Sequence, residues 1–285
     1  MSDQQTLVNL WKCIKKLFKK PDMISTPIGF YNSFDPDALR FITVTGISDD
    51  TQKNAINQLV KDLKNDALWS KFQAIYPVIG GTAGTHKYNL IDPRDEDTAF
   101  RLDFTSHWSH TSDGMTPDGI ADFADTHFVP DGNLVDRDDS HFCIYSRSDV
   151  MVVDQQDLGC GRSTVELMIR PGTNAIDFQD GRGAGNQMGF LFTNTLGLIL
   201  MTREGLSDLK GYQNTTLIGS AVGSHFFGLN TRKIYLGAAN DDGVADNFST
   251  RQLAFASIGT SMDASEESLF YDIVQNYQTT LGRAV

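Results

Sequence analysis

The chain has 285 residues, of which 40 % are hydrophobic, and a formal net charge of −12. This length suits one large domain, or one domain with a small appendage, and the apolar share is sufficient for a sizeable core. A surface with this net charge repels phosphate, so nucleic acid is excluded as a general partner.

The cysteines and the hydropathy pattern bear on the compartment in which the protein is made. Cys13, Cys143 and Cys160 form no Cys-x-x-Cys pair, and an odd number argues against a complete disulfide framework. No apolar run approaches the ~18 residues that cross a bilayer, and the N-terminus lacks the apolar core and cleavage site of a signal peptide. We therefore expect reduced thiols in an unprocessed protein that is made in a cytoplasm.

Residues 1–21 are predicted to form a basic amphipathic helical arm. Five lysines against one acid give residues 1–20 a charge of +4, which leaves −16 for the rest of the chain. Apolar residues recur at three- and four-residue intervals, with the lysines on the opposite face. Such a helix can pack on its own domain, dock on a protein partner or, least favoured here, lie on a membrane surface. The residues expected to dock are Leu7, Leu10, Trp11, Ile14, Leu17 and Phe18.

Residues 22–66 are predicted to be a linker followed by a helical preface. The linker is rich in small polar residues, with a proline and a glycine. Asp35 is expected to cap a short helix that ends at Gly46. Ser48 is then expected to cap a longer helix over about 49–65, in which apolar residues repeat at helical spacing.

The remaining residues, 67–285, are predicted to form one antiparallel β-sandwich that ends in a helix. Short alternating runs, separated by turns rich in Gly, Asn and Asp, indicate many short strands and almost no interior helix. Asn194 and Thr195, between two apolar runs, are expected to form a tight hairpin tip. The predicted strands are Phe72–Ile79, Lys87–Leu90, Ala99–Phe104, Phe123–Phe128, His141–Ser146, Thr164–Arg170, Met188–Thr193, Leu196–Thr202, Leu206–Tyr212, Thr215–Ser220, Lys233–Ala238 and Gln252–Ile258.

The predicted C-terminal helix carries its own start and stop signals. Asp263 is the expected N-cap, and Glu266, three residues later, completes a capping box. Gly282 is placed to end the helix in the left-handed conformation. The apolar face between them is expected to pack on the sheet that the strand Gln252–Ile258 completes.

Three segments of the chain resemble a family that is common in bacteriophage genomes. They are LWSKFQAIYPVIGGTAGTHKYNLIDPRDEDTAFRL (68–102), IYLGAAND (234–241) and RQLAFASIGTSMDASEESLFYDIVQNYQTTLGR (251–283). With the helical preface, the similarity spans about 36–283. The family consists of laminin-G-like or concanavalin-A-like sandwich domains. The resemblance implies a mainly β protein, with a concanavalin-A-like antiparallel β-sandwich (jelly roll), N-terminal helices and a C-terminal helix.

Members of this family often sit at the distal ends of phage tail or head fibres. The resemblance therefore implies a virion structural protein, assembled in the host cytoplasm, whose arm attaches to other virion proteins. Its sandwich would be exposed as a fibre or capsid-decoration module for host attachment through a surface carbohydrate. Fibre tips are commonly trimeric, so a homotrimer is considered, although the chain has no heptads. Decoration of the capsid or tail without a ligand stays open as an alternative.

Enzyme activity is not expected from the residues. Glycoside hydrolysis needs two carboxyl groups that face each other across a groove. The chain has only five glutamates, none of which begins the Glu-x-Asp-x-x-Glu pattern of sandwich-fold glycanases, and it has no Gly-x-Ser-x-Gly elbow. The open alternative is a polysaccharide depolymerase of the tail that uses an unrecognised pair of aspartates.

The segment 104–110 combines aromatic and histidine residues. Trp108 could stack on the apolar face of a sugar ring, while His107 and His110 exchange hydrogen bonds with its hydroxyl groups. The same two histidines, with Asp113, could bind a metal ion if a loop brings them together. The alternative is a strand that ends in a polar loop, with the tryptophan partly buried.

The segment 240–247 offers several hard oxygen ligands around a glycine turn. Asp241, Asp242 and Asp246 are the candidate ligands for Ca²⁺, which prefers oxygen-rich loops. The spacing is not that of an EF-hand, so a solvated hairpin loop is the alternative. The acidic run over 131–139 has the same two interpretations.

Overall fold

The computed structural model describes residues 34–134, 136, 138–152, 155–160, 167–172, 175–179, 187–189, 194–205, 208–221 and 231–285. Asp35–Val285 form one compact unit, which contains every helix and strand described. The predicted arm at 1–21 lies outside the described residues, together with its docking residues. In the described ranges, no helix is suited to crossing a membrane.

The first helix, α2 (Pro36–Thr45), begins and ends as the sequence predicts. The Asp35 carboxylate accepts a hydrogen bond of 2.9 Å from the backbone N–H of Asp37. Proline at the first helical position has no N–H that needs an acceptor there. Gly46 ends the helix at a φ of 68°, a conformation that glycine adopts without a steric penalty.

The second helix, α3 (Asp50–Asn65), is capped one residue later than predicted. The Asp49 side chain, and not that of Ser48, accepts a hydrogen bond of 2.8 Å from the Gln52 N–H. The prediction for Ser48 was wrong because Asp49 is the residue that precedes the first helical turn, where a side-chain oxygen can reach that N–H. The apolar stripe of the helix is buried as expected, and it comprises Ala55, Ile56, Leu59, Val60 and Leu63.

An antiparallel sheet of eight strands forms the middle of the compact unit. Its order is β13-β12-β11-β6-β17-β4-β3, and β1 also pairs with β17. The strands are β1 (Phe72–Tyr76), β3 (Ser109–Thr111), β4 (Gly114–Thr116), β6 (Asp139–Ser146), β11 (Gly197–Glu204), β12 (Leu209–Gln213), β13 (Thr216–Ala221) and β17 (Leu253–Gly259).

A second antiparallel sheet, of seven strands in the order β10-β9-β8-β7-β14-β5-β2, packs against the first. The fold class predicted from the sequence, a mainly β antiparallel sandwich with N-terminal helices and a C-terminal helix, is thereby confirmed. The strands are β2 (Asp103–Phe104), β5 (Ala124–Asp125), β7 (Leu158–Cys160), β8 (Leu167–Gly172), β9 (Ala175–Gln179), β10 (Gln187–Gly189) and β14 (Tyr235–Leu236), and a separate hairpin joins β15 (Ala239–Asp241) to β16 (Val244–Asp246).

The apolar core lies between the two sheets. Successive side chains of a strand point to opposite faces, so every second residue of a strand enters this core. The eight-stranded sheet contributes Tyr76, Phe142, Ile144, Ile199, Met201, Ala256 and Ile258, and the seven-stranded sheet contributes Ala124, Leu158, Cys160 and Leu236.

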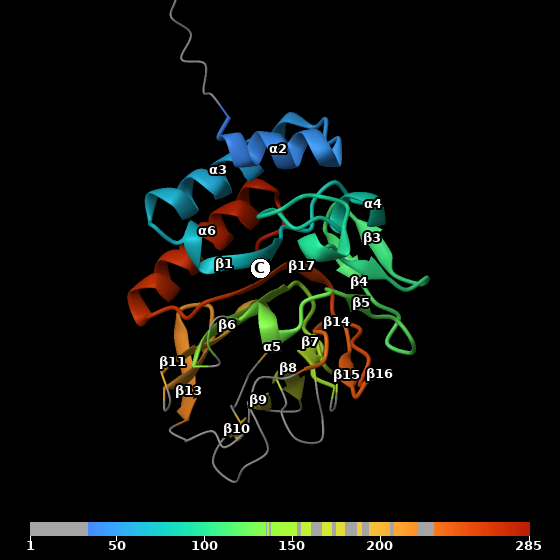
Figure 1. The fold of residues 1–285 in the computed structure, drawn as a ribbon, viewed down its shortest axis with the longest axis vertical. Helices are drawn as coiled ribbons and strands as arrows, with labels where there is room; N and C mark the ends of the chain where they lie inside the picture. The colour runs from blue at the N-terminus through green and yellow to red at the C-terminus, as the bar shows by residue number, and fades with distance from the viewer. Residues whose placement is uncertain are drawn as a thin grey trace, which may run out of the picture. The chain divides into compact units, whose positions relative to one another are not determined.

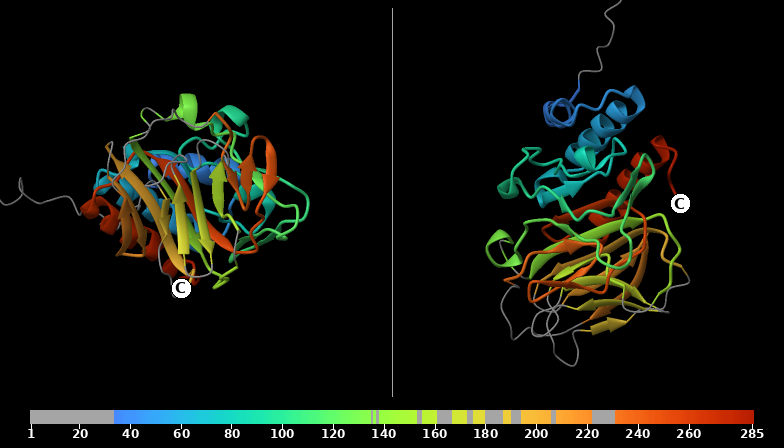
Figure 2. Two further views of the ribbon diagram at one scale, coloured as in Figure 1. Left: turned by 90° about the horizontal axis from the view of Figure 1, so that it is seen from below. Right: turned by 90° about the vertical axis from the view of Figure 1, so that its right-hand side faces the viewer.

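The other face of the eight-stranded sheet is covered by the helix α6 (Ala264–Thr280). The ring centroids of Phe270 and Phe72 lie 5.2 Å apart, and those of Tyr277 and Phe255 lie 6.4 Å apart. Figures 1 and 2 show α2, α3 and α6 on the side of this sheet opposite the seven-stranded sheet. The helix packs on the strand that the sequence predicts, and β17 is consequently buried on both faces.

Both ends of α6 follow the sequence prediction. The Asp263 carboxylate accepts hydrogen bonds from the N–H groups of Ser265 and Glu266, and the Glu266 side chain accepts one from the Asp263 N–H. At the other end Gly282 has a φ of 70°, and its N–H donates to the carbonyl of Thr279. The helix therefore has a capping box and a left-handed terminus.

The segment Lys87–Leu90, predicted as a strand, lies in a loop instead. The side chain of the buried Asn89 forms hydrogen bonds with backbone groups that a neighbouring strand would otherwise pair with. Its Oδ1 accepts from the N–H of Ile75, and its Nδ2 donates to the carbonyls of Gln73 and Ala99. An amide side chain can satisfy backbone groups in this way without extended pairing.

Asn194 and Thr195 do not form the predicted hairpin tip. The strand before them, β10, pairs with β9 in the seven-stranded sheet, and the strand after them, β11, pairs with β6 and β12 in the other. The two residues therefore lie on a connection between the sheets. Thr195 Oγ1 donates to the carbonyl of Ser148 at 2.8 Å, which ties this connection to the end of β6.

Candidate functional site

Trp108, the predicted sugar-stacking residue, lies in the core. It is 8 % exposed, and its ring centroid is 5.4 Å from that of Phe104. A Cβ on Gly237 would lie only 2.8 Å from the edge of the indole, so protein atoms also close on that side. A ring enclosed in this way has no free face for a sugar, and the alternative of a buried tryptophan describes the structure.

His110 pairs with a histidine that the sequence analysis did not consider. Its Nδ1 lies 2.9 Å from Nδ1 of His86, whose Nε2 accepts a hydrogen bond from the Gly81 N–H. His86 therefore carries its hydrogen on Nδ1 and donates to His110. Burial, with help from the neighbouring His110, lowers the pKa of His86 to about 3, and burial also lowers the pKa of His110. The pair is neutral at ordinary pH, and Asp113 faces Arg147 instead of the histidines.

His107 points away from this pair toward two acids. Its Nδ1 lies 3.7 Å from Asp122 Oδ1 and 4.0 Å from Asp118 Oδ2. Asp122 is fully buried, and its Oδ1 accepts from Thr105 Oγ1 and from the His107 N–H, which fixes the loop. The three side chains form a group with ligand spacing for a metal ion, although the imidazole is 67 % exposed.

The three aspartates proposed as calcium ligands lie on the hairpin of β15 and β16. Asp241 ends the first strand, Asp242 occupies the turn at a φ of 53°, and Asp246 ends the second strand. Two groups of described residues have metal-ligand spacing, and neither contains any of these three acids. In the acidic run 131–139, Asp139 accepts hydrogen bonds from the backbone and side chain of Ser261, so it has a structural role.

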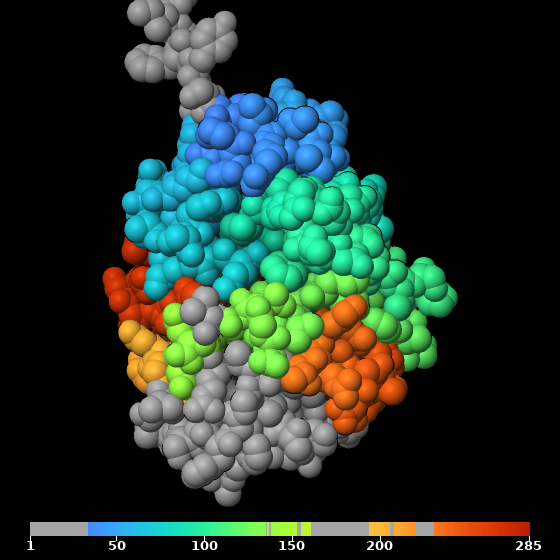
Figure 3. Space-filling view, viewed as in Figure 1, coloured from blue at the N-terminus to red at the C-terminus, as the bar shows by residue number. Residues whose placement is uncertain are grey.

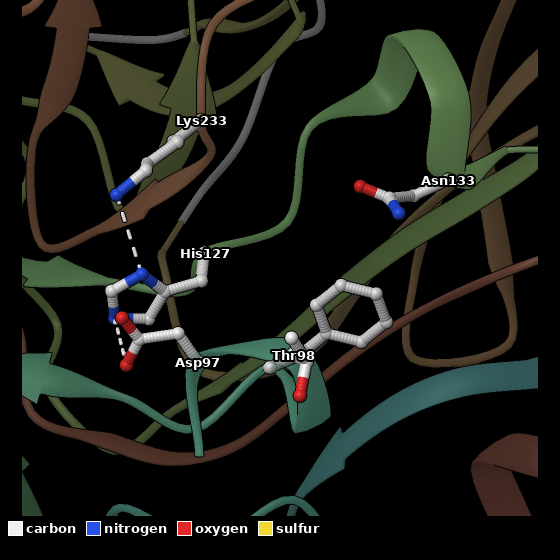
Figure 4. Close-up of a pocket in the computed structure, with 6 residues that line it drawn as sticks. Asp97, Thr98, His127, Asn133 and Lys233 are labelled. Atoms are coloured by element: carbon white, nitrogen blue, oxygen red, sulfur yellow. Dashed lines mark hydrogen bonds and ion pairs between the residues drawn. The ribbon is translucent and has the colours of Figure 1, made fainter.

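A pocket of about 450 Å³ opens at the edge of the seven-stranded sheet. It lies where the turn before β2, the loop after β5, the short helix α5 (Pro130–Asn133) and the segment before β14 come together (Figure 4). Figure 3 shows the surface around β14 beside the surface around α5. The lining residues are Asp97, Thr98, Phe100, His127, Asn133 and Lys233.

Two lining residues have an unusual backbone conformation. His127 has a φ of 56° and Phe100 a φ of 58°, in the left-handed region that side chains larger than glycine seldom adopt. The His127 N–H donates a hydrogen bond of 2.7 Å to Asp125 Oδ1, which holds the turn. Conformations of this kind concentrate at functional sites, where the surrounding structure compensates for them.

Charged groups surround the imidazole of His127. Lys233 Nζ lies 2.7 Å from Asp125 Oδ2 and donates to His127 Nδ1 at 3.3 Å. On the other side of the ring, Nε2 lies 3.5 Å from Asp97 Oδ1 and 3.4 Å from Asp103 Oδ2. The hydrogen bond to Asp125 raises the pKa of Lys233, so its ammonium group is charged at neutral pH.

Arg101 holds the two acids in place. Its guanidinium donates to Asp97 Oδ1 at 2.9 Å and lies 3.2 Å from Asp103 Oδ1. The hydrogen bond from Arg101 lowers the pKa of Asp97 below its ordinary value. The wall of the pocket therefore presents fixed negative charge beside the ammonium group of Lys233.

This pocket was not predicted from the sequence. Asp97, Thr98 and Phe100 fall in the segment 68–102, for which strands and a family resemblance were predicted but no binding site. The pocket residues have no common spacing along the chain, because four connections bring them together. The signal available in the sequence was the density of charged residues just before β2, and it does not by itself indicate a pocket.

No protein-family model matches the chain, and no curated protein matches it. Similar solved structures include the K499G mutant of the NanB sialidase of Streptococcus pneumoniae, with 14 % identity over 46 % of this chain and 23 % of that one, at a TM-score of 0.41. Domain 4 of the GH43 arabinanase AbnA of Geobacillus stearothermophilus, solved with arabinotriose, has 13 % identity over 72 % of this chain and 98 % of that one, at a TM-score of 0.41.

A mutant of the Trypanosoma rangeli sialidase has 9 % identity over 77 % of this chain and 39 % of its own, at a TM-score of 0.46. The chain thus spans less than half the length of either sialidase. At these identities the likeness concerns the fold alone.

The prediction that the protein is not an enzyme is corrected by these comparisons. It depended on the missing glutamate pattern, whereas the similar structures include two sialidases and a domain of an arabinanase.

Proposed function

We propose that this protein binds a carbohydrate in the pocket lined by His127 and Lys233. The observation that carries the proposal is the mixture of groups in the lining: a carboxylate, a hydroxyl, an amide, an ammonium group and the partly exposed ring of Phe100. Sugar hydroxyls both donate and accept hydrogen bonds, and the C–H face of a sugar ring packs on an aromatic side chain. The volume falls in the range of small-ligand sites, about 300–1,000 Å³.

We further propose that the protein is a virion component of a bacteriophage that presents this sandwich to a host-surface carbohydrate. The resemblance of residues 36–283 to phage fibre and decoration domains supports this part of the proposal. The arm over 1–21 would attach the protein to another virion subunit. Its basic face and apolar stripe are suited to an acidic, partly apolar groove.

Carbohydrate binding is tested with the full chain on an array of bacterial and host glycans, followed by calorimetry on each hit. Lys233→Met and Thr98→Val should each weaken binding about tenfold, since each removes a group that can hydrogen-bond a sugar hydroxyl. Asp272→Asn, at an exposed position of α6, is the control and should bind as the wild type does. No binding by the wild type at millimolar sugar would contradict the proposal.

The same samples distinguish binding from cleavage. Each bound polysaccharide is incubated with the protein, and released reducing ends are measured. If the wild type releases reducing ends and either Asp97→Asn or Asp103→Asn abolishes the release, the pocket is the active site of a depolymerase. These two acids are tested because they are the carboxylates beside His127.

The role of the arm is tested by deletion. Removing residues 1–21 should abolish incorporation of the protein into particles and leave carbohydrate binding unchanged. Incorporation of the shortened chain at the wild-type level would show that attachment resides elsewhere.

A further inference from the structure

The imidazole of His127 has an unusual environment on its Nε2 side. The side chain is only 10 % exposed, and Nε2 has no hydrogen-bond partner in the part of the chain that the structure describes. It nevertheless points at two carboxylate oxygens, Asp97 Oδ1 at 3.5 Å and Asp103 Oδ2 at 3.4 Å. An N–H group pointing at a carboxylate normally closes to about 2.7–3.2 Å. Both distances exceed that range.

These distances match the spacing of ligands around one small metal ion. Zinc binds nitrogen and carboxylate oxygen at about 2.0–2.2 Å, usually as a tetrahedron. Two ligands of such a tetrahedron lie about 3.4 Å apart, from the bond length and the tetrahedral angle. The three ligand atoms all lie within 4.8 Å of one another. We propose that Asp97, Asp103 and His127 form a site for one zinc ion at the wall of the pocket.

The donor set favours zinc over calcium. Calcium takes six to eight oxygen ligands, whereas zinc accepts an imidazole nitrogen together with carboxylate oxygens at low coordination number. Three protein ligands leave the fourth position of the tetrahedron for water or another small ligand. Because Asp97 and His127 both line the pocket, that position is close to the pocket space.

The neighbouring groups allow a cation here. Asp97 and Asp103 have side chains that are 59 % and 54 % exposed, so an ion can reach them from solvent. Arg101 donates to both proposed ligand oxygens, to Asp97 Oδ1 at 2.9 Å and to Asp103 Oδ2 at 3.4 Å, and each carboxylate oxygen has a second lone pair that can face an ion. Zinc on Nε2 puts the ring hydrogen on Nδ1, so the hydrogen bond that Lys233 donates to Nδ1 in this structure has to open, and Asp125 Oδ1, 4.0 Å from Nδ1, is the carboxylate on that side that can accept instead.

The test is calorimetric titration of Zn²⁺ into the chelator-stripped full chain, without sugar. Cys13→Ser is included in every protein so that this thiol does not contribute, and Cys143 and Cys160 are buried. The expected result is one zinc ion per chain. His127→Asn, which suits a left-handed backbone, and Asp103→Asn should each weaken binding at least tenfold.

Two controls separate this site from nonspecific attraction and from the second acidic group. Asp95→Asn removes an equal charge from a neighbour that also contacts Arg101, and it should leave the affinity within about twofold. His107→Asn disables the group of His107, Asp118 and Asp122 and should have no effect. Absence of zinc binding by the parent protein, or loss in His107→Asn with retention in His127→Asn, would overturn the proposal.

Unfolding curves establish that each variant is folded. If His127→Asn does not fold, Asp103→Asn still tests the site, because Asp103 is exposed and its substitution should not disturb the fold. Since no sugar is present, the outcome is independent of the carbohydrate proposal. Zinc binding without carbohydrate binding, or the reverse, would leave one proposal standing and remove the other.

Discussion

Glu267, on α6, carries a carboxyl group in an apolar setting. The residue is 2 % exposed, and its Oε1 has no hydrogen-bond partner among the described residues. Burial, with a smaller contribution from the charge of Asp272, raises the pKa of Glu267 from 4.5 to about 7. Burial of an unpaired carboxyl favours its neutral form, and the cost of ionising it is subtracted from the stability of the fold.

This cost depends on pH with a definite sign. Below pH 4.5 the group is protonated in both states and costs nothing. Between pH 4.5 and about 7 the unfolded chain ionises while the folded one does not, so stability falls as pH rises. Glu267→Gln should therefore stabilise the protein by about 2 kcal/mol at pH 8 and by much less at pH 4.

Denaturant unfolding at the two pH values checks this prediction. Glu204→Gln, at an exposed position on β11, is the control and should change stability little at either pH. An equal effect of Glu267→Gln at both pH values would show that the raised pKa is not the cause.

At the scale of single elements, α6 illustrates how local signals set the ends of a helix. Asp263 accepts two backbone N–H groups, and Gly282 occupies a left-handed position that a Cβ would strain. Both signals act within a few residues, so they can be identified from the sequence. The sheet beneath decides only which face of the helix is buried.

Removing either signal should destabilise the helix measurably. Asp263→Ala should cost about 1 kcal/mol through the loss of the capping acceptor, and Gly282→Ala about 1 kcal/mol through the strained φ. Thermal unfolding of both variants, with Ser265→Ala at an exposed position of the first turn as the control, measures these effects. A control as unstable as the variants would contradict the assignment.

At the scale of the whole molecule, a buried ion pair links the two sheets at the beginnings of two interior strands. Arg251, just before β17, and Asp157, just before β7, are both fully buried, with Nε 2.7 Å from Oδ2. The guanidinium also donates to the carbonyls of Val150 and Gln155. The pair thus connects the eight-stranded sheet to the seven-stranded one through two charged side chains that have both been removed from water.

Breaking this pair should be costly because it leaves one charge buried alone. Asp157→Asn should lower the free energy of unfolding by about 3–5 kcal/mol. Replacing both residues, as Asp157→Leu with Arg251→Met, should cost less than the sum of the two single changes, since no lone charge remains. Denaturant unfolding of the wild type, Asp157→Leu, Arg251→Met and the double variant checks this. Additive losses of unfolding free energy would show that the two side chains act separately.

The sequence by itself determined the features that depend on neighbours along the chain. The predicted helix boundaries are confirmed at Asp35 and Asp263, which begin α2 and α6, and at Gly46 and Gly282, which follow their last turns. Capping and left-handed turns involve residues within about four positions of each other, so the sequence contains the whole signal. Alternation and turn residues likewise sufficed for the antiparallel sandwich. The strand predicted over His141–Ser146 corresponds to β6, which begins two residues earlier and ends at the same residue.

Only the tertiary structure decided which surfaces are free. Trp108 was a candidate for sugar contact, with partial burial as the alternative, and it is enclosed by Phe104 of β2 and by the backbone at Gly237, which is distant in sequence. Asn89 replaces a predicted strand because it lies beside β1. The pocket around His127 unites connections more than a hundred residues apart, and the order of strands in the sheet, which no local pattern encodes, brings them together.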